Sequence, residues 1–136
     1  MSLTEEVKQA AMQAGADLLG IASPDRFDVL PAHQHPAAIM PAVRSIIVIG
    51  RRIPRGCVRP IEEGTNFQTY ELFGYYWLDT EFLALTTYQL CAWLEDRGFE
   101  AVPIFPFPPE AWPQGVAVRE GQPAPNVQFP MEYAAV

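Results

Sequence analysis

Four arginine side chains are gathered in one short segment of this sequence. The four are Arg51, Arg52, Arg55 and Arg59, out of only nine basic residues in a chain of formal charge −7. They directly follow an apolar run, and loops that leave the carboxyl end of a sheet strand commonly bind ligands in open α/β folds. Guanidinium groups hold phosphate or carboxylate through paired, charge-assisted hydrogen bonds. The cluster predicts a site for a phosphate-bearing small molecule; the alternative is a solvated loop that balances Glu62 and Glu63.

A second polar segment, residues 64–70, precedes a long apolar pattern. Its Asn66, Gln68 and Tyr70 side chains suit hydrogen bonding to a ligand, so we group them with the arginines as candidate cofactor-binding residues. The alternative is that Thr65 or Asn66 only caps the helix that follows.

The cysteines and histidines are few and scattered. Cys57 lies among the arginines, which would lower the pKa of a thiol, but no histidine is near in sequence to act as its base, so an ordinary cysteine is favoured. Cys91 lies in an apolar helix pattern and is expected in the core. His33 and His35 would share one face of an extended segment, yet two ligands do not make a metal site. We assign no metal site and no catalytic residue.

The first half of the chain predicts a helix and two strands. Ser2 to Glu5 has capping-box spacing, and Gly15 stands where a left-handed helix cap is expected. Residues 18–22 form a short apolar strand. The β-branched run at 45–50 does not alternate, which predicts a strand buried on both faces.

The second half predicts a loop, one long helix and a further strand. Prolines and glycines between 51 and about 68 indicate a loop. Residues 70–98 predict one helix with little polar surface, which we therefore expect to be central, with the aromatic group at Tyr70, Tyr75, Tyr76 and Trp77 in the core. Residues 100–105 predict a strand at an edge or bulge.

Composition restricts the class of protein. The chain has 136 residues, 49% apolar and 18% charged, as expected of a folded domain. Its negative charge argues against binding nucleic acid or a membrane surface, and no apolar run is long enough for a membrane helix. We expect a cytoplasmic protein with reduced thiols. Eight of the fourteen prolines lie between Pro103 and Pro130, which predicts a domain over 1–105 followed by an extended arm over 106–136.

Four segments, in this order, resemble the N-terminal domain of epoxyqueuosine-reductase-like iron–sulfur proteins, which are related to reductive dehalogenases. The segments are 14–22 (AGADLLGIA), 40–50 (MPAVRSIIVIG), 64–70 (GTNFQTY) and 94–103 (LEDRGFEAVP). The resemblance implies a single nitroreductase-like layered α/β domain with a central sheet and a long central helix. It also implies a cobalamin cofactor, with two [4Fe–4S] clusters in a following part that this sequence does not contain.

The resemblance carries over no catalytic residue, because family members use an aspartate in the segment matching this C-terminal tail and no aspartate follows Asp96. Two hypotheses follow. The chain is the cofactor-binding domain of such a redox protein, or it is a non-catalytic binding or assembly module. A large inventory of aromatic side chains, including Trp77, Trp93 and Trp112, further predicts a homodimer.

Overall fold

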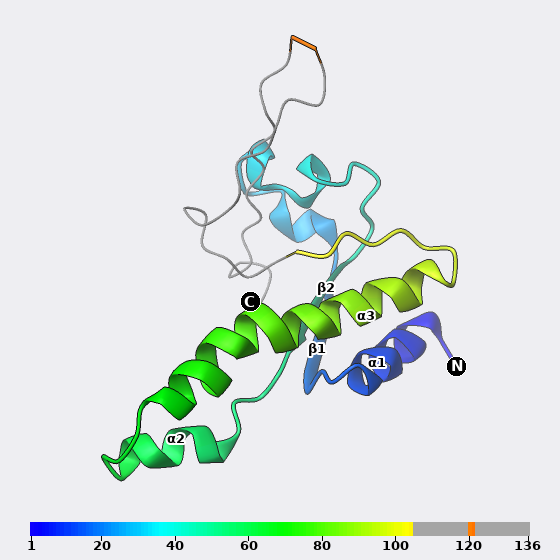
Figure 1. The fold of residues 1–136 in the computed structure, drawn as a ribbon. Coiled ribbons are helices and arrows are strands. Elements are labelled where there is room, and N and C mark those ends of the chain that lie inside the picture. The colour runs from blue at the N-terminus through cyan, green and yellow to red at the C-terminus, as the bar shows by residue number, and fades with distance from the viewer. Residues whose placement is uncertain (105–119, 122–136) are drawn as a thin grey trace. The chain divides into compact units, whose positions relative to one another are not determined.

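The computed structural model describes residues 1–104 and 120–121. The expected proline-rich arm over 106–136 lies, apart from 120–121, outside the described residues. Two compact units are present, one made of Met1–Gly20 with Ile49–Phe105 and the other containing Ile21–Val48. Figure 1 traces the described helices and strands in chain order. Within the part of the chain that is described, no helix is both long and apolar enough to cross a lipid bilayer.

Helix α1 (Leu3–Gln13) begins and ends as its sequence predicts. The Ser2 hydroxyl accepts a hydrogen bond from the Glu5 amide at 3.3 Å, and the Glu5 carboxylate accepts from the Ser2 amide at 2.8 Å. These bonds complete the capping box and lower the pKa of Glu5, chiefly through the backbone bond. Gly15 follows the helix with φ of +105°, the left-handed region expected there.

The two predicted strands pair with each other. They are β1 (Leu18–Ala22) and β2 (Ile46–Gly50). The Asp17 amide, just before β1, donates to the carbonyl oxygen of Gly50, the last residue of β2, at 2.8 Å, so the strands run antiparallel. The α/β character is therefore present.

Two expectations about the sheet are wrong for the described residues. Every residue of β2 is half-buried rather than buried on both faces, and within the described residues β2 pairs with one strand, β1. Residues 100–104, expected to start a further strand, have no regular structure. Pro103 lacks the backbone N–H that a sheet ladder requires.

Helix α2 (Arg55–Glu62) occupies the middle of the segment predicted as a loop. Pro54 precedes its first residue and Pro60 lies inside it, which is why the sequence suggested irregular structure. The helix packs against the segment that follows it, and Cys57 is buried. Pro60 has no backbone N–H, so it donates no hydrogen bond within the helix.

The long helix expected over 70–98 is present as a continuous helical run, but its first half is π-helical. The π-helical segments are η4 (Tyr70–Tyr76) and η5 (Leu78–Phe82), and α3 (Leu83–Glu95) continues them. Gly98 follows with φ of +84°. Residues 73, 75, 76, 85 and 88 carry large apolar side chains that are 46% to 68% exposed, so much of this apolar run lies at the surface of the described structure.

A four-residue repeat explains the π-helical geometry. The buried residues of the run are separated by multiples of four positions: Gly74, Leu78, Thr86, Leu90 and Leu94. In an α-helix each four-residue step exceeds the 3.6-residue turn by about 40°, so five steps would carry the stripe by about 200° to the opposite face. A π-helix has more residues per turn than an α-helix, so a four-residue step in it falls short of a full turn. The π-helical steps therefore rotate the buried stripe in the opposite direction and cancel the rotation that the α-helical steps add. The stripe therefore stays on one side, where α1 packs against α3.

In the other unit, residues 21–48 contain three short 3₁₀ turns, η1 (Pro24–Phe27), η2 (Ala32–Gln34) and η3 (Pro36–Ala38). Phe27 is almost fully buried and is the main apolar anchor of these turns.

Candidate functional site

Arg51, the first residue of the arginine cluster, points into the protein. Its guanidinium donates to the Thr86 hydroxyl at 3.3 Å and to the Phe82 carbonyl oxygen at 3.4 Å, and its central carbon lies 5.8 Å from the centre of the Phe82 ring. Thr86 is fully buried and donates in turn to the Ala14 carbonyl oxygen at 2.9 Å. This places a positive charge at the carboxyl end of α1, where the helix dipole is negative. These contacts indicate a structural role for the Arg51 side chain.

The position of the Arg51 guanidinium also explains why residue 15 is a glycine. A β-carbon at this position would lie 3.1 Å from the guanidinium carbon of Arg51, and the backbone φ is unfavourable for side chains. Both the close approach and the backbone conformation require glycine here.

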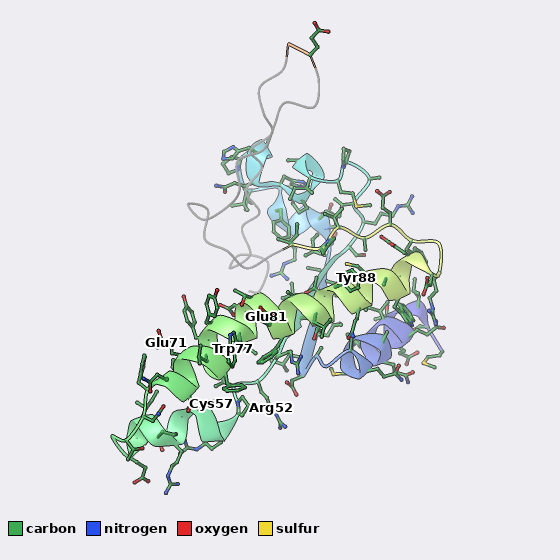
Figure 2. All side chains as sticks on the ribbon, viewed as in Figure 1. Arg52, Cys57, Glu71, Trp77, Glu81 and Tyr88 are labelled. Atoms are coloured by element: carbon green, nitrogen blue, oxygen red, sulfur yellow. The ribbon has the colours of Figure 1, made fainter. Side chains whose placement is uncertain are left out.

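Arg52 faces solvent. Its backbone amide donates to the Asp17 carboxylate at 2.8 Å, while its side chain is 81% exposed and lies 4.0 Å from the same carboxylate. Figure 2 labels Arg52 together with Cys57 of α2. Of the four arginines, Arg52 has the guanidinium that is most available to a ligand.

Arg55 and Arg59 form ion pairs within and next to α2. Arg55 donates to Glu62 at 2.7 Å, and Arg59 donates to Glu63 at 2.7 Å. The hydrogen bond between Arg55 and Glu62 raises the pKa of the arginine and lowers the pKa of the glutamate. Both pairs are exposed and therefore weak and sensitive to salt.

The four arginine side chains do not point toward a common partner within the chain. Each engages a different partner, and the balance with Glu62 and Glu63 matches the alternative interpretation of the cluster. The physical reason is the helix: spacings of four and seven residues along α2 bring each arginine to an acid on the same helix face. Sequence reasoning missed this because it treated the segment as a loop.

The polar segment before the long helix divides into a cap and two ligand candidates. The Asn66 side chain accepts from the Thr69 amide at 3.0 Å, as a capping residue does. Gln68 is exposed. The Tyr70 ring is half-buried against Gly74, where a β-carbon would come within 2.8 Å of it, and its centre lies 6.0 Å from that of Phe67.

Asp79, on η5, is a titratable residue that sequence reasoning missed. Partial burial raises the pKa of its carboxyl, and it forms no hydrogen bond or ion pair with the described residues. A carboxyl that keeps its proton to higher pH has the property needed in a proton donor. The signal was available as an acidic residue at a position within the apolar pattern of the helix.

Neither cysteine resembles an activated thiol. Cys57 is buried, in agreement with an ordinary structural role. Burial and the nearby Glu95 carboxylate raise the pKa of Cys91, which opposes formation of its thiolate.

His35 uses both ring nitrogens within its own unit. Nε2 lies 3.0 Å from the Asp28 carboxylate, and Nδ1 accepts from the Ala37 amide at 3.0 Å. His33 is exposed and lies in a 3₁₀ turn rather than an extended strand, so the two rings do not have the geometry that the HxH spacing suggested. Among the described residues, no group of three or more potential metal ligands occurs.

The aromatic group at the start of the long helix is partly on the surface. Tyr75 and Tyr76 are 61% and 56% exposed, so the expectation that the whole group is core is wrong. Trp77 is half-buried, with its ring centre 5.0 Å from that of Phe73 in an edge-to-face contact. Figure 2 shows Trp77, Glu81 and Tyr88 along this run.

Comparison with known protein families, with curated proteins and with solved structures finds no match to this chain.

Proposed function

We propose that this chain is the cofactor-binding domain of an epoxyqueuosine-reductase-like, cobalamin-dependent iron–sulfur redox protein, without the part that binds the clusters. The observation that carries the proposal is the position of residues 64–70, one of the segments that bear the resemblance. They stand directly before the π-helical stretch from Tyr70 to Phe82. π-Helical turns occur frequently at functional sites.

The exposed side chains near this stretch fit such a cofactor chemically. A corrinoid carries amide groups and, in its full form, a phosphate. The exposed guanidinium of Arg52 and the amide of Gln68 are suitable hydrogen-bonding partners for these groups. Among the described residues, Arg55 and Arg59 are held by exposed ion pairs, which a phosphate can replace. The nitroreductase-like layering, the cytoplasmic location and a homodimeric state belong to the same proposal.

Titration followed by ultraviolet–visible spectroscopy tests this function. We expect hydroxocobalamin to bind the purified chain with a saturable shift of its absorption bands, and flavin mononucleotide to give a weaker response. An Arg52→Ala/Gln68→Ala variant should bind at least about tenfold more weakly, a loss of about 1.4 kcal/mol. A Lys8→Ala/Gln13→Ala variant removes the same two kinds of group from exposed positions of α1 and should bind like the wild type. Equal binding by both variants contradicts the assignment.

The second candidate is a non-catalytic binding or assembly module. It is favoured by the pairing of Arg55 and Arg59 with their own acids and by the exposed aromatic side chains of the long helix. Absence of any cobalamin or flavin response, together with stable self-association, would support this function over the first.

A further inference from the structure

His35 joins the turns η2 and η3, because it is the last cap of the first and the first cap of the second. Its backbone amide donates to the Ala32 carbonyl oxygen at 3.3 Å, and its carbonyl oxygen accepts from the Ala38 amide at 2.9 Å. Its ring nitrogen Nδ1 accepts from the Ala37 amide at 3.0 Å and so caps η3. The side chain is only 21% exposed, and the Phe27 ring contacts it edge to face with ring centres 6.4 Å apart.

These contacts determine which ring nitrogen of His35 carries the proton. A backbone N–H can only donate, so Nδ1 must offer its lone pair to the Ala37 amide. The single proton of the neutral ring then lies on Nε2, which donates to the Asp28 carboxylate at 3.0 Å. Both contacts together therefore require the neutral ring in one tautomer. In this state His35 has no free lone pair with which to accept a proton from a substrate or to bind a metal ion.

We propose that His35 is a pH-sensitive cap, which holds the turn η3 when its ring is neutral and releases it when the ring is protonated. Histidine is the side chain that ordinarily changes charge between about pH 5 and pH 8. In the charged ring both nitrogens carry hydrogen, so Nδ1–H would face the N–H of Ala37 across 3.0 Å. Turning the ring over does not help, because it only exchanges one donor for the other. The cap is thus present at neutral pH and lost as the pH falls.

The charges around the ring decide how strongly protonation is opposed. The Asp28 carboxylate favours the charged ring, but it is 68% exposed, so its attraction is weak. The turns that pack against η3 are η1, with the oppositely charged Asp25 and Arg26, and η2, with His33, and all three of these residues are exposed. The hydrogen bond to the Ala37 amide is part-buried. We therefore expect its loss to outweigh the attraction to Asp28.

The turn that His35 caps also forms part of a pocket wall. This open pocket has a volume of about 510 Å³ and is lined by Asp28, Leu30, Ala32, His35, Ala37 and Ala38. Because Ala37 and Ala38 belong to η3, release of the turn changes the shape of the pocket. The cap acts independently of the proposed cofactor, since none of its residues is among the candidate cofactor-binding residues.

Nuclear magnetic resonance of the ¹⁵N-labelled full chain tests the tautomer. At about pH 7.5 we expect the Nδ1 of His35 to have the chemical shift of an unprotonated ring nitrogen and Nε2 that of a protonated one. The His33→Gln variant removes the other histidine ring of the chain and so assigns the signals. A protonated Nδ1 at this pH overturns the proposal.

Hydrogen exchange of the Ala37 amide, corrected for the intrinsic effect of pH, tests the release. Protection should fall at least about fivefold between about pH 7.5 and about pH 5 in wild type and in His33→Gln. His35→Asn is the decisive variant, because an asparagine oxygen caps a turn in the same way and does not titrate. Its protection should change less than about twofold over this range. Constant protection in wild type, or an equal loss in His35→Asn, overturns the proposal, whereas hydroxocobalamin binding at about pH 7.5 reports on the proposed function alone.

Discussion

The hydroxyl of Thr86 donates to the carbonyl oxygen of Ala14 at 2.9 Å, joining residues 72 positions apart in the chain. Thr86 is fully buried on α3, and Ala14 is the cap residue at the end of α1. The same hydroxyl accepts from Arg51 at 3.3 Å. One side chain thus links the carboxyl end of α1, the residue after β2 and the long helix, and it determines that Arg51 points inward.

Thr86→Val should lower the free energy of unfolding by about 1–3 kcal/mol, because it leaves the Ala14 carbonyl and an Arg51 donor without a buried partner while keeping the side-chain shape. Urea denaturation followed by circular dichroism measures this. Thr87→Val is the control, since the Thr87 hydroxyl only donates to the Leu83 carbonyl oxygen within its own helix. An equal effect of the two substitutions would show that the link between the helices contributes nothing.

Gly15→Ala should destabilise the fold by about 1–3 kcal/mol, because alanine is strained at φ of +105° and its β-carbon would lie 3.1 Å from the Arg51 guanidinium. Gly20→Ala provides a comparison, since a β-carbon there meets nothing within 4 Å. We expect it to be neutral or slightly stabilising. Thermal melting of both variants is sufficient, and a neutral Gly15→Ala would exclude this packing of Arg51.

Asp79→Asn should stabilise the protein at pH 7 and have less effect at acidic pH. Burial raises the pKa of Asp79 in the folded state. The folded chain therefore holds this proton more tightly, so its contribution to stability is fully present below the unfolded pKa and is lost as the pH rises through the folded pKa. Urea denaturation from pH 4 to pH 7 should give a flatter profile for the variant. Glu81→Gln, at an exposed position, is the control, and a profile as steep in Asp79→Asn as in wild type contradicts the prediction.

Cys91 should react slowly with a thiol-specific alkylating reagent at pH 7 and markedly faster at pH 9. Burial and the Glu95 carboxylate raise the pKa of the thiol, so little thiolate is present near neutrality. Mass spectrometry of the peptides distinguishes Cys91 from the buried Cys57. Rapid modification of Cys91 at pH 7 would indicate that this part of α3 is not packed as described.

The local elements of the described fold could be predicted because their signals lie within a few neighbouring residues. The capping box of Ser2 and Glu5, the left-handed cap at Gly15 and the apolar strands at 18–22 and 46–50 depend on backbone geometry and short-range hydrogen bonds. Helix α2 could not be predicted in this way. Its prolines favour a loop, whereas the burial of Cys57 and the packing of α2 against the segment that follows it arise only in the folded chain.

The sequence by itself determined that residues 70–95 are helical, since apolar side chains recur through a stretch free of proline. Only the tertiary structure decided that the first half is π-helical, because the four-residue repeat must remain on the side that α1 and α2 cover. The direction in which each arginine side chain points also depends on the tertiary structure. A guanidinium can pair with any acceptor in reach, and the acceptors of Arg51 are 31 and 35 positions away along the chain, where only folding brings them together.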